Sequence, residues 1–339
     1  MRIGTIGNGV IVRDFLTALR ALSAEEDVSC VAMLALRKAD YPATKMLADE
    51  FEVGKVYESE EEFFQDPEID FVYIALPNAF HYQYSMKALQ SGKNVFCEKP
   101  FVPTYAQAKD LAETAKEHHR MIFEMITTLY FPNYLSLKER MKEIGKVTIA
   151  ECNFSHVSGK YYDLLAGKNP NVFSLEMCAG AFADMGIYAA HFLMGIFGKP
   201  EEAVYFANRY ETGIDTAGML AMKWEDCCGV AISSKHSRGR NALILQGEDG
   251  YISCDCGGNF ITGYTITKGK ESEYVNVQPD KPRLYFELKT FKQIFDANDY
   301  EKCYEILDYT QMVVSVCESA RKKAGIYYPA DEEYFHVSR

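Results

Sequence analysis

The stretch IGTIGNGVIVRDFLTAL, residues 3–19, leads a short apolar segment into two glycines and then into a helical pattern. A strand, a glycine turn and a helix N-terminus together form the usual binding place for a dinucleotide pyrophosphate. The spacing Gly7-x-Gly9-x-x-Val12 lacks the third small residue of that fingerprint, so a plain packing turn is the alternative. The cofactor-binding residues that this turn predicts are Gly7, Asn8, Gly9, Val10 and Ile11.

Strand and helix signals alternate through the first 125 residues. Strands of a parallel sheet covered on both faces are typically continuous apolar runs, and such runs recur here with helical spacing between them. Repeated units of this length predict an α/β fold, the doubly wound parallel sheet of a Rossmann domain. The expected strands are 3–6, 28–35, 70–76, 94–97 and 121–124, and the expected helices begin after Gly9, at Asp40, at Asn78 and at a Thr104-x-x-Gln107 capping box.

The pattern changes after residue 125, so we expect a Rossmann domain over 1–124 and an α+β domain over 125–339, whose last residues could pack back on the first. Alternating segments predict a large, mostly antiparallel open sheet. Its second face lacks helices to cover it and is the expected interface of a homodimer or homotetramer; a solvated face is the alternative. The expected strands are 147–157, 203–208, 218–224, 230–235 and 242–246, with helices over 133–144, 285–297 and 304–323.

Composition and charge argue against several functional classes. The 339 residues carry 36 Lys and Arg against 48 Asp and Glu, and a net charge of −12 does not suit a surface that follows nucleic-acid phosphates. No segment approaches the roughly 18 apolar residues of a membrane helix, and the first residues show no signal-peptide order. The ten cysteines include no C-x-x-C pair, so we expect reduced thiols, no metal and a cytoplasmic enzyme of small molecules.

The end of the second expected strand bears on the choice of cofactor. NAD enzymes usually carry an acidic residue there that binds the ribose hydroxyls. This sequence instead has Ala35-Leu36-Arg37-Lys38. Guanidinium and ammonium groups suit a 2′-phosphate, so we expect NADP rather than NAD, bound by Arg37 and Lys38. Ordinary surface charges are the alternative.

Further motifs recur in order along the chain: Pro77-Asn78 before His81, Gly92-Lys93-Asn94-Val95, Glu98-Lys99-Pro100, Asp184-x-Gly186-x-Tyr188 and the segment 321–329. Together they resemble the glucose-fructose oxidoreductase/inositol dehydrogenase/MocA (Gfo/Idh/MocA) family over the whole chain. The Glu-Lys-Pro motif is the most specific of them. The tyrosine at 188, where many members carry histidine, resembles the branch of dimeric dihydrodiol dehydrogenases and some xylose dehydrogenases.

The resemblance implies roles for the residues that follow the expected strands 70–76 and 94–97. In the family the Lys-Pro peptide bond is often cis and directs the lysine toward the substrate beside the nicotinamide. Lys99 would then stabilise the substrate oxyanion; a lysine at the surface is the alternative. The residues expected to border the cofactor here are Leu76, Pro77, Asn78, His81, Glu98, Lys99 and Pro100.

Asp184 and Tyr188, four residues apart, would share one helix face. The resemblance implies that Tyr188 is the acid–base group and that Asp184 orients Lys99 or a substrate hydroxyl. The pKa of a free tyrosine hydroxyl is about 10, and the Lys99 ammonium would favour the phenolate form of Tyr188. Tyr188 as a core aromatic and His191 as the acid–base group are the alternatives. His156 and Tyr162, with Tyr161, are candidate substrate contacts.

The expected function is hydride transfer between a nicotinamide cofactor and a secondary alcohol or carbonyl of a sugar, cyclic polyol or dihydrodiol. Three alternatives stay open on the same fold. They are an aldose oxidoreductase with tightly bound cofactor, a glycosidase-type member that uses NAD transiently, and a non-catalytic cofactor-binding sensor. The presence of Lys99, Asp184 and Tyr188 argues against the sensor.

Overall fold

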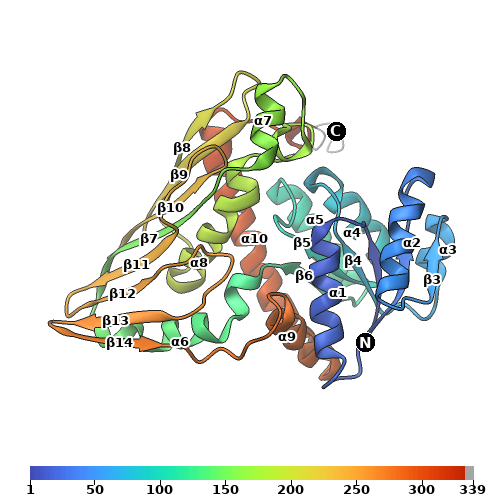
Figure 1. Cartoon of the computed structure of the whole chain (residues 1–339), viewed down its shortest axis with the longest axis horizontal. Helices are drawn as coiled ribbons and strands as arrows, with labels where there is room; N and C mark the ends of the chain where they lie inside the picture. Colours follow the sequence, from blue (N-terminus) through green and yellow to red (C-terminus); the bar gives the residue numbers. More distant parts are fainter. Residues whose placement is uncertain (333–339) are drawn as a thin grey trace. The chain divides into compact units, whose positions relative to one another are not determined.

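The computed structural model describes residues 1–332, and the chain divides into two compact units (Figure 1). The first unit contains Met1–Met125 and Asp280–Gln311; the second contains Ile126–Pro279 and the residues from Met312 on. The expected boundary at 124/125 lies beside this division. Residues 280–311, which the sequence placed in the second domain, instead belong to the first unit.

Within residues 1–332, the first unit is built on six parallel strands in the order β3-β2-β1-β4-β5-β6. This order is that of the Rossmann fold, with its switch point between β1 and β4, so the predicted doubly wound sheet is confirmed. The strands are β1 Arg2–Ile6, β2 Ser29–Leu34, β3 Lys55–Tyr57, β4 Phe71–Ile74, β5 Asn94–Glu98 and β6 Ile122–Met125. β3 has no counterpart among the strands expected from the sequence.

The helices of the first unit follow the expected starts with small differences. Val12 is fully buried in α1, whereas Ile11 is only half-buried. A 3-10 turn from Asn78 precedes α4, which begins at His81. Oγ1 of Thr104 accepts a hydrogen bond from the Gln107 amide at 3.3 Å, as the capping box predicts. The helices are α1 Val10–Leu22, η1 Lys38–Asp40, α2 Tyr41–Glu50, α3 Glu60–Gln65, η2 Asn78–Phe80, α4 His81–Gln90, α5 Tyr105–Glu117, α9 Tyr285–Asp296 and the first part of α10 Tyr300–Lys323.

Aromatic packing explains why residues 280–311 join the first unit. Phe291 of α9 stacks on Phe123 of β6 with ring centroids 4.3 Å apart. One turn further, Phe295 meets Phe71 of β4 edge to face at 5.1 Å. Such side chains bury large apolar areas, so α9 completes the core on this face of the sheet.

Within residues 1–332, the second unit is built on eight strands in the order β14-β13-β12-β11-β7-β10-β9-β8. β7 and β10 pair in parallel, and the remaining neighbours pair antiparallel. The predicted mostly antiparallel sheet is confirmed. The strands are β7 Val147–Ser155, β8 Glu202–Arg209, β9 Asp215–Lys223, β10 Cys228–Ser234, β11 Ala242–Gly247, β12 Tyr251–Cys254, β13 Tyr264–Lys268 and β14 Glu271–Val275, of which the last three were not expected.

Helices of the second unit lie on one face of this sheet (Figure 1). The opposite face carries partly exposed apolar side chains, including Phe206 at 59% and Met219 at 46% relative exposure on paired strands. Its further exposed members are Ile149, Val204, Tyr251 and Tyr274. The helices are η3 Thr127–Tyr130, α6 Pro132–Arg140, η4 Met141–Ile144, α7 Gly159–Leu165, η5 Asn171–Phe173, the π-helical turn η6 Phe182–Gly186, α8 Ile187–Phe197 and the remainder of α10.

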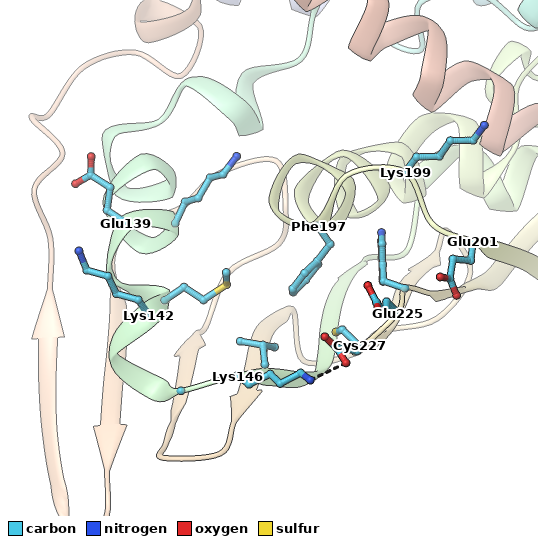
Figure 2. Close-up of a pocket in the computed structure, with 14 residues that line it drawn as sticks. Glu139, Lys142, Lys146, Phe197, Lys199, Glu201, Glu225 and Cys227 are labelled. Atoms are coloured by element: carbon cyan, nitrogen blue, oxygen red, sulfur yellow. Dashed lines mark ion pairs between the residues drawn. The ribbon is translucent and has the colours of Figure 1, made fainter.

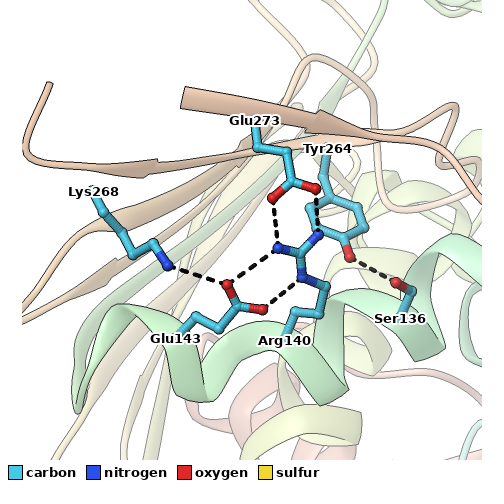
Figure 3. Close-up of polar contacts among 6 residues, drawn as sticks. All are labelled: Ser136, Arg140, Glu143, Tyr264, Lys268 and Glu273. Atoms are coloured by element: carbon cyan, nitrogen blue, oxygen red, sulfur yellow. Dashed lines mark hydrogen bonds and ion pairs between the residues drawn. The ribbon is translucent and has the colours of Figure 1, made fainter. Parts of the chain in front are cut away.

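A charged cluster ties the edge strand β14 to the end of α6 (Figure 3). The guanidinium of Arg140 forms paired hydrogen bonds with Glu143, at 2.6 and 3.1 Å, and with Glu273 of β14, at 2.9 and 2.7 Å. Arg140 lowers the pKa of Glu143 to about 2. Beside it, Ser136 and Tyr264 share a hydrogen bond of 2.7 Å. Strand β14 is therefore held by side chains as well as by its backbone ladder.

No helix in residues 1–332 combines the length and the apolar character that crossing a bilayer requires. In the same part of the chain, His, Cys, Asp and Glu side chains form no group of three or more that could hold a metal ion.

Candidate active site

The glycine turn after β1 forms a cradle that fits a dinucleotide. Gly7 has φ +119°, and a Cβ there would lie 2.4 Å from the carbonyl oxygen of Ala75. Only glycine fits at this close approach to β4. A Cβ on Gly9, by contrast, would meet none of the described atoms within 4 Å, and Val10 at the start of α1 is 80% exposed. Open space in front of a helix N-terminus is what a pyrophosphate needs.

The cationic pair after β2 lies at the edge of the sheet where this cradle opens. Arg37 is 78% exposed and forms two hydrogen bonds with Asp40, at 2.8 and 2.7 Å. Asn8 of the glycine turn donates to the Asp40 carbonyl at 3.3 Å, which links the two segments. Lys38 is also exposed. Arg37 therefore has a carboxylate partner that the sequence did not suggest.

His81 ties together the two loops that follow β4 and β5. Its Nδ1 lies 2.9 Å from the carbonyl oxygen of Pro100 and 3.2 Å from that of Phe101. Its Nε2 lies 2.9 Å from the carbonyl oxygen of Leu76. The ring is fully buried, and this burial lowers its pKa despite the nearby carbonyls. His81 thus positions the loops that follow β4 and β5 relative to each other.

Glu98 ends β5, and Lys99 begins the loop beyond it, with a cis peptide bond between Lys99 and Pro100. Glu98 is 5% exposed; its Oε1 accepts from the Tyr73 hydroxyl at 2.7 Å and its Oε2 from the Lys99 amide at 3.2 Å. Burial raises the pKa of Glu98, although Lys99 and Tyr73 favour its charged form. A buried carboxyl therefore anchors the backbone of Lys99 at the ligand-binding edge of the sheet.

The neighbouring motif residues Lys93 and Asn94 have a structural role. The ammonium of Lys93 is buried and donates to the carbonyl oxygens of Asp66, at 2.6 Å, and Ile69, at 3.0 Å. Asn94 bonds the backbone of Asp70 at 3.0 Å and of Met121 at 2.8 Å. These contacts join the starts of β4, β5 and β6, at the end of the strands opposite Lys99.

In the second unit, Asp184 and Tyr188 lie on one continuous helical segment, but the segment is not a uniform α-helix. Asp184 is in the π-helical turn η6 and Tyr188 in the first turn of α8. π-helical turns are uncommon and often occur at functional sites. A Cβ on Gly186 would lie 2.6 Å from the ring of Phe182 and 2.9 Å from Oγ of Ser233. The glycine in this motif therefore permits close packing of the turn on β10.

Asp215 anchors the start of this turn, and sequence analysis did not identify it. The side chain is 1% exposed, and its Oδ2 accepts from the Phe182 amide and the Tyr205 hydroxyl, both at 2.7 Å. Burial raises the pKa of Asp215. Its position next to the turn depends on the pairing of β9 with β8 and β10, so no local sequence signal marks it.

Lys235, directly after β10, is a second residue that sequence analysis missed. Its ammonium forms an ion pair with Asp184 and lies 5.0 Å from the centre of the Phe173 ring. The Lys235 side chain is 2% exposed, whereas that of Asp184 is 37% exposed. Asp184 therefore has a buried counter-charge within its own unit.

Aromatic and imidazole rings gather around this pair. Tyr161 lies 5.5 Å from His236 and 6.1 Å from Phe173, measured between ring centroids. Phe154 meets Tyr188 edge to face at 5.9 Å and lies 5.8 Å from His156. Of the candidate substrate contacts, His156 and Tyr161 belong to this group. Tyr162, whose ring centroid lies 6.3 Å from that of Tyr161, is 65% exposed. His191 is fully buried in α8, one turn beyond Tyr188.

A pocket of about 610 Å³ in the second unit lies at the opposite end of α8 from Tyr188 (Figure 2). Phe197, Trp224 and Cys227 line it, with lysines and carboxylates around them, including the Lys146–Asp226 ion pair of 2.6 Å. Its lining contains none of the residues that sequence analysis proposed for the site. This pocket is therefore separate from the segment that carries Asp184 and Tyr188.

Comparison with family models decides the relationship. Residues 1–125 match the model of an oxidoreductase family with an NAD-binding Rossmann fold, GFO_IDH_MocA, and residues 134–253 match the GFO/IDH/MocA C-terminal domain. The chain belongs to the GFO/IDH/MocA family. It is an NAD(P)-dependent oxidoreductase of this family, and its first unit is the NAD(P)-binding Rossmann domain. The resemblance drawn from the sequence motifs is confirmed.

Named relatives are similar over most of the chain. The scyllo-inositol 2-dehydrogenase (NADP(+)) IolU of Bacillus subtilis is 27% identical over 263 residues, 78% of this chain and 80% of its own. The trans-1,2-dihydrobenzene-1,2-diol dehydrogenase of Mus musculus is 27% identical over an alignment of 347 positions, which covers 98% of this chain and 99% of its own.

Solved structures share the fold at lower identity. KijD10, a 3-ketoreductase from Actinomadura kijaniata solved with NADP, has a TM-score of 0.80 at 20% identity, covering 97% of this chain and 99% of its own. The aldose-aldose oxidoreductase from Caulobacter crescentus has a TM-score of 0.80 at 15% identity, covering 96% and 97%.

Proposed function

We propose that the enzyme uses NADP in preference to NAD and interconverts a secondary alcohol and a carbonyl on a sugar, a cyclic polyol or a dihydrodiol. The observation that carries the proposal is the position of Lys99. Its backbone is held by the buried Glu98 at the carboxyl end of β5, the edge of the sheet where Gly7 and Gly9 form the cradle. Ligands of open α/β sheets bind at this edge.

The proposed chemistry divides the work among three side chains. The nicotinamide supplies or accepts the hydride at its C4 atom when the cofactor is bound. The ammonium of Lys99 stabilises negative charge on the substrate oxygen, as donors do in oxyanion holes. Tyr188 exchanges the hydroxyl proton, and Asp184, held by Lys235, orients a substrate hydroxyl.

The cationic pair Arg37 and Lys38 supports the preference for NADP. Both side chains are exposed at the end of β2, where an NAD enzyme would carry a carboxylate for the ribose. The curated relative IolU is named as an NADP(+) enzyme, and KijD10 was solved with NADP. Two cations at this place suit a ligand with an additional phosphate.

The surroundings of Asp184 support a ring-shaped polyhydroxylated substrate. Carboxylate and ammonium groups together can accept from and donate to hydroxyls, and aromatic walls suit the faces of carbon rings. Tyr161, Phe154 and His156 supply such walls near Asp184 and Tyr188. The relatives named for inositol and dihydrodiol oxidation act on substrates of this general shape.

The deciding experiment measures turnover and cofactor binding separately. Absorbance of the reduced nicotinamide is followed with NADP and NAD against aldoses, inositols and dihydrodiols, for the wild type and Lys99→Ala. Lys109→Ala, an exposed lysine of α5, serves as the matched control. We expect turnover that disappears in Lys99→Ala and persists in the control. Cofactor binding without turnover on any member of the panel would instead favour a sensor on this fold.

We also propose that the exposed face of the eight-stranded sheet joins copies of the chain into a homodimer or homotetramer. Phe206, Met219, Ile149 and Tyr251 place apolar atoms on this face, opposite the face that α8 covers. Contiguous exposed apolar patches on folded proteins commonly mark interaction sites. Two such faces would bury each other.

A further inference from the structure

Glu287 interrupts an otherwise aromatic stripe on α9. Residues 287, 291 and 295 are spaced by one helical turn each, so they share a face. Phe295 packs on Phe71 at the start of β4, and Phe291 packs on Phe96 and Phe123 further along the strands. The next turn toward the start of α9 therefore brings Glu287 to the carboxyl ends of the same strands, where Tyr73 and Glu98 lie.

The carboxyl group of Glu287 is buried, but it takes no part in the aromatic packing of α9 on the sheet. It is 1% exposed, and neither of its oxygens has a hydrogen-bond partner among residues 1–332. Leaving a buried polar group unsatisfied is costly, and burying an unpaired charge costs more. A phenylalanine or leucine at this place would continue the stripe, so the carboxyl calls for an explanation.

Charged and titratable groups surround Glu287 on the α9 side of the sheet. They are Tyr73 of β4, Glu98 at the end of β5 and Arg283 just before α9, which also pairs with Asp14 of α1 at 3.6 Å. Glu124 of β6 acts on Glu287 as well, although it alternates with Phe123 and so lies on the opposite face of the sheet. Burial, with the charges of Glu98 and Glu124, raises the pKa of Glu287 well above its usual value. Two carboxyls in one buried site cannot both ionise readily.

We propose that Glu287 is a positioning residue for Lys99: it carries the proton of a carboxyl pair with Glu98 and so leaves Glu98 ionised beneath the Lys99 backbone. The proton belongs on Glu287 because Glu98 has the donors, the Tyr73 hydroxyl at 2.7 Å and the Lys99 amide at 3.2 Å. A neutral polar group beside a buried carboxylate stabilises its charge better than hydrocarbon does. This inference rests on the proposed role of Lys99.

Two variants separate this role from simple core filling. Glu287→Gln keeps a neutral polar group of the same shape, whereas Glu287→Leu continues the apolar stripe. In Glu287→Leu the Glu98 carboxylate loses its polar neighbour and takes up a proton more readily. We expect the acid limb of kcat/KM to move to higher pH by about one unit in Glu287→Leu and to return toward the wild-type position in Glu287→Gln. KM for the cofactor should stay unchanged in both variants.

A second measurement does not depend on turnover. Infrared difference spectra of the wild type minus Glu287→Gln at neutral pH should show the carbonyl band of a protonated carboxylic acid. Glu113→Gln, an exposed glutamate of α5, is the control and should show only a carboxylate difference. A carboxylate band at Glu287, or pH profiles that coincide in all three proteins, would overturn the proposal. If the infrared band is present while Lys99→Ala remains active, the carboxyl pair stands and the role of Lys99 is what fails.

Discussion

The carboxylate of Asp184 accepts a hydrogen bond from the ammonium of Lys235, and the two partners differ sharply in exposure. The Lys235 side chain is 2% exposed and that of Asp184 is 37% exposed. Removing Asp184 would leave a buried ammonium without this counter-charge, whereas removing Lys235 would leave a carboxylate that water can reach. Loss of Asp184 should therefore destabilise the fold more than loss of Lys235.

We expect Asp184→Ala to lower the free energy of unfolding by about 3 kcal/mol and Lys235→Met to lower it by about 1 kcal/mol or less. Urea unfolding of both variants measures the difference, and both variants should lose kcat/KM. A larger decrease in the free energy of unfolding for Lys235→Met than for Asp184→Ala would contradict the argument from burial. Lys168→Met, an exposed lysine of the same unit, is the control for removing a lysine charge.

The two glycines of the cradle should respond differently to alanine. Gly7→Ala meets both the positive φ and the Ala75 carbonyl oxygen at 2.4 Å, so it should destabilise the protein by more than about 3 kcal/mol. Gly9→Ala meets open space, so the protein should unfold at the wild-type temperature but bind cofactor at least about tenfold more weakly. Calorimetry and cofactor titration test the pair. Wild-type binding by Gly9→Ala would place the pyrophosphate elsewhere.

Replacing Arg37 and Lys38 together with alanine should weaken NADPH binding by at least about tenfold, or 1.4 kcal/mol, and leave NADH binding nearly unchanged. Asp40→Asn should strengthen NADPH binding, because the carboxylate that holds Arg37 also repels a phosphate. Fluorescence titration with both cofactors measures these changes. Lys45→Ala on α2 is the control, and an equal loss for NADH and NADPH would rule out phosphate recognition by this pair.

His81 should make stability fall at mildly acidic pH. Its folded-state pKa lies below the usual value of 6.5, so below pH 6.5 the unfolded chain binds a proton that the folded chain excludes. The free energy of unfolding contributed by this group is thus fully present above pH 6.5. It decreases as the pH falls, by at most about 1.4 kcal/mol per unit. Urea unfolding between pH 7 and 5 should show a free energy of unfolding that changes less with pH in His81→Gln than in the wild type; an equal pH dependence in the two proteins would contradict this role of burial.

A charge on the exposed sheet face should dissociate the proposed oligomer. Phe206→Glu introduces a carboxylate into an apolar patch without touching the helix-covered face. We expect light scattering coupled to size-exclusion chromatography to show a lower mass than for the wild type. Tyr105→Glu, an exposed position on α5, should leave the mass unchanged. A monomeric wild type would end the proposal outright.

Sequence reasoning predicted the parts of the fold in which burial imposes a strong local pattern. Strands such as Phe71–Ile74 are buried on both faces and therefore stand out as apolar runs. The two edge strands that it missed lack this signal: β3 has three half-buried residues, and β14 buries only Val275 of its five. The register of such edge strands depends on partners such as Arg140, which are distant in sequence.

The site was predictable only where motif residues carry the chemistry themselves. Lys99, Asp184 and Tyr188 belong to short sequence motifs, so the sequence alone could suggest them as site residues. Lys235 directly follows strand β10, a position where charged residues are common, and its partner Asp184 lies 51 residues away in the sequence. No local pattern therefore marks Lys235 as a site residue. Glu287 falls on a helix face that three-dimensional packing alone identifies as interior. Helical spacing, likewise, placed Asp184 and Tyr188 on an α-helix and could not reveal the π-helical turn.

The return of residues 280–311 to the first unit has a consequence during synthesis. At roughly 5–20 residues per second, the ribosome takes about 8–30 s to make the 154 residues from Ile126 to Pro279. Throughout that interval the nascent Rossmann sheet lacks Phe291 and Phe295, and the aromatic face that they cover is available to chaperones or to aggregation. The cofactor-binding unit begins at Met1 and its synthesis starts first, yet it is complete only when residues 280–311 have been added, after most of the second unit.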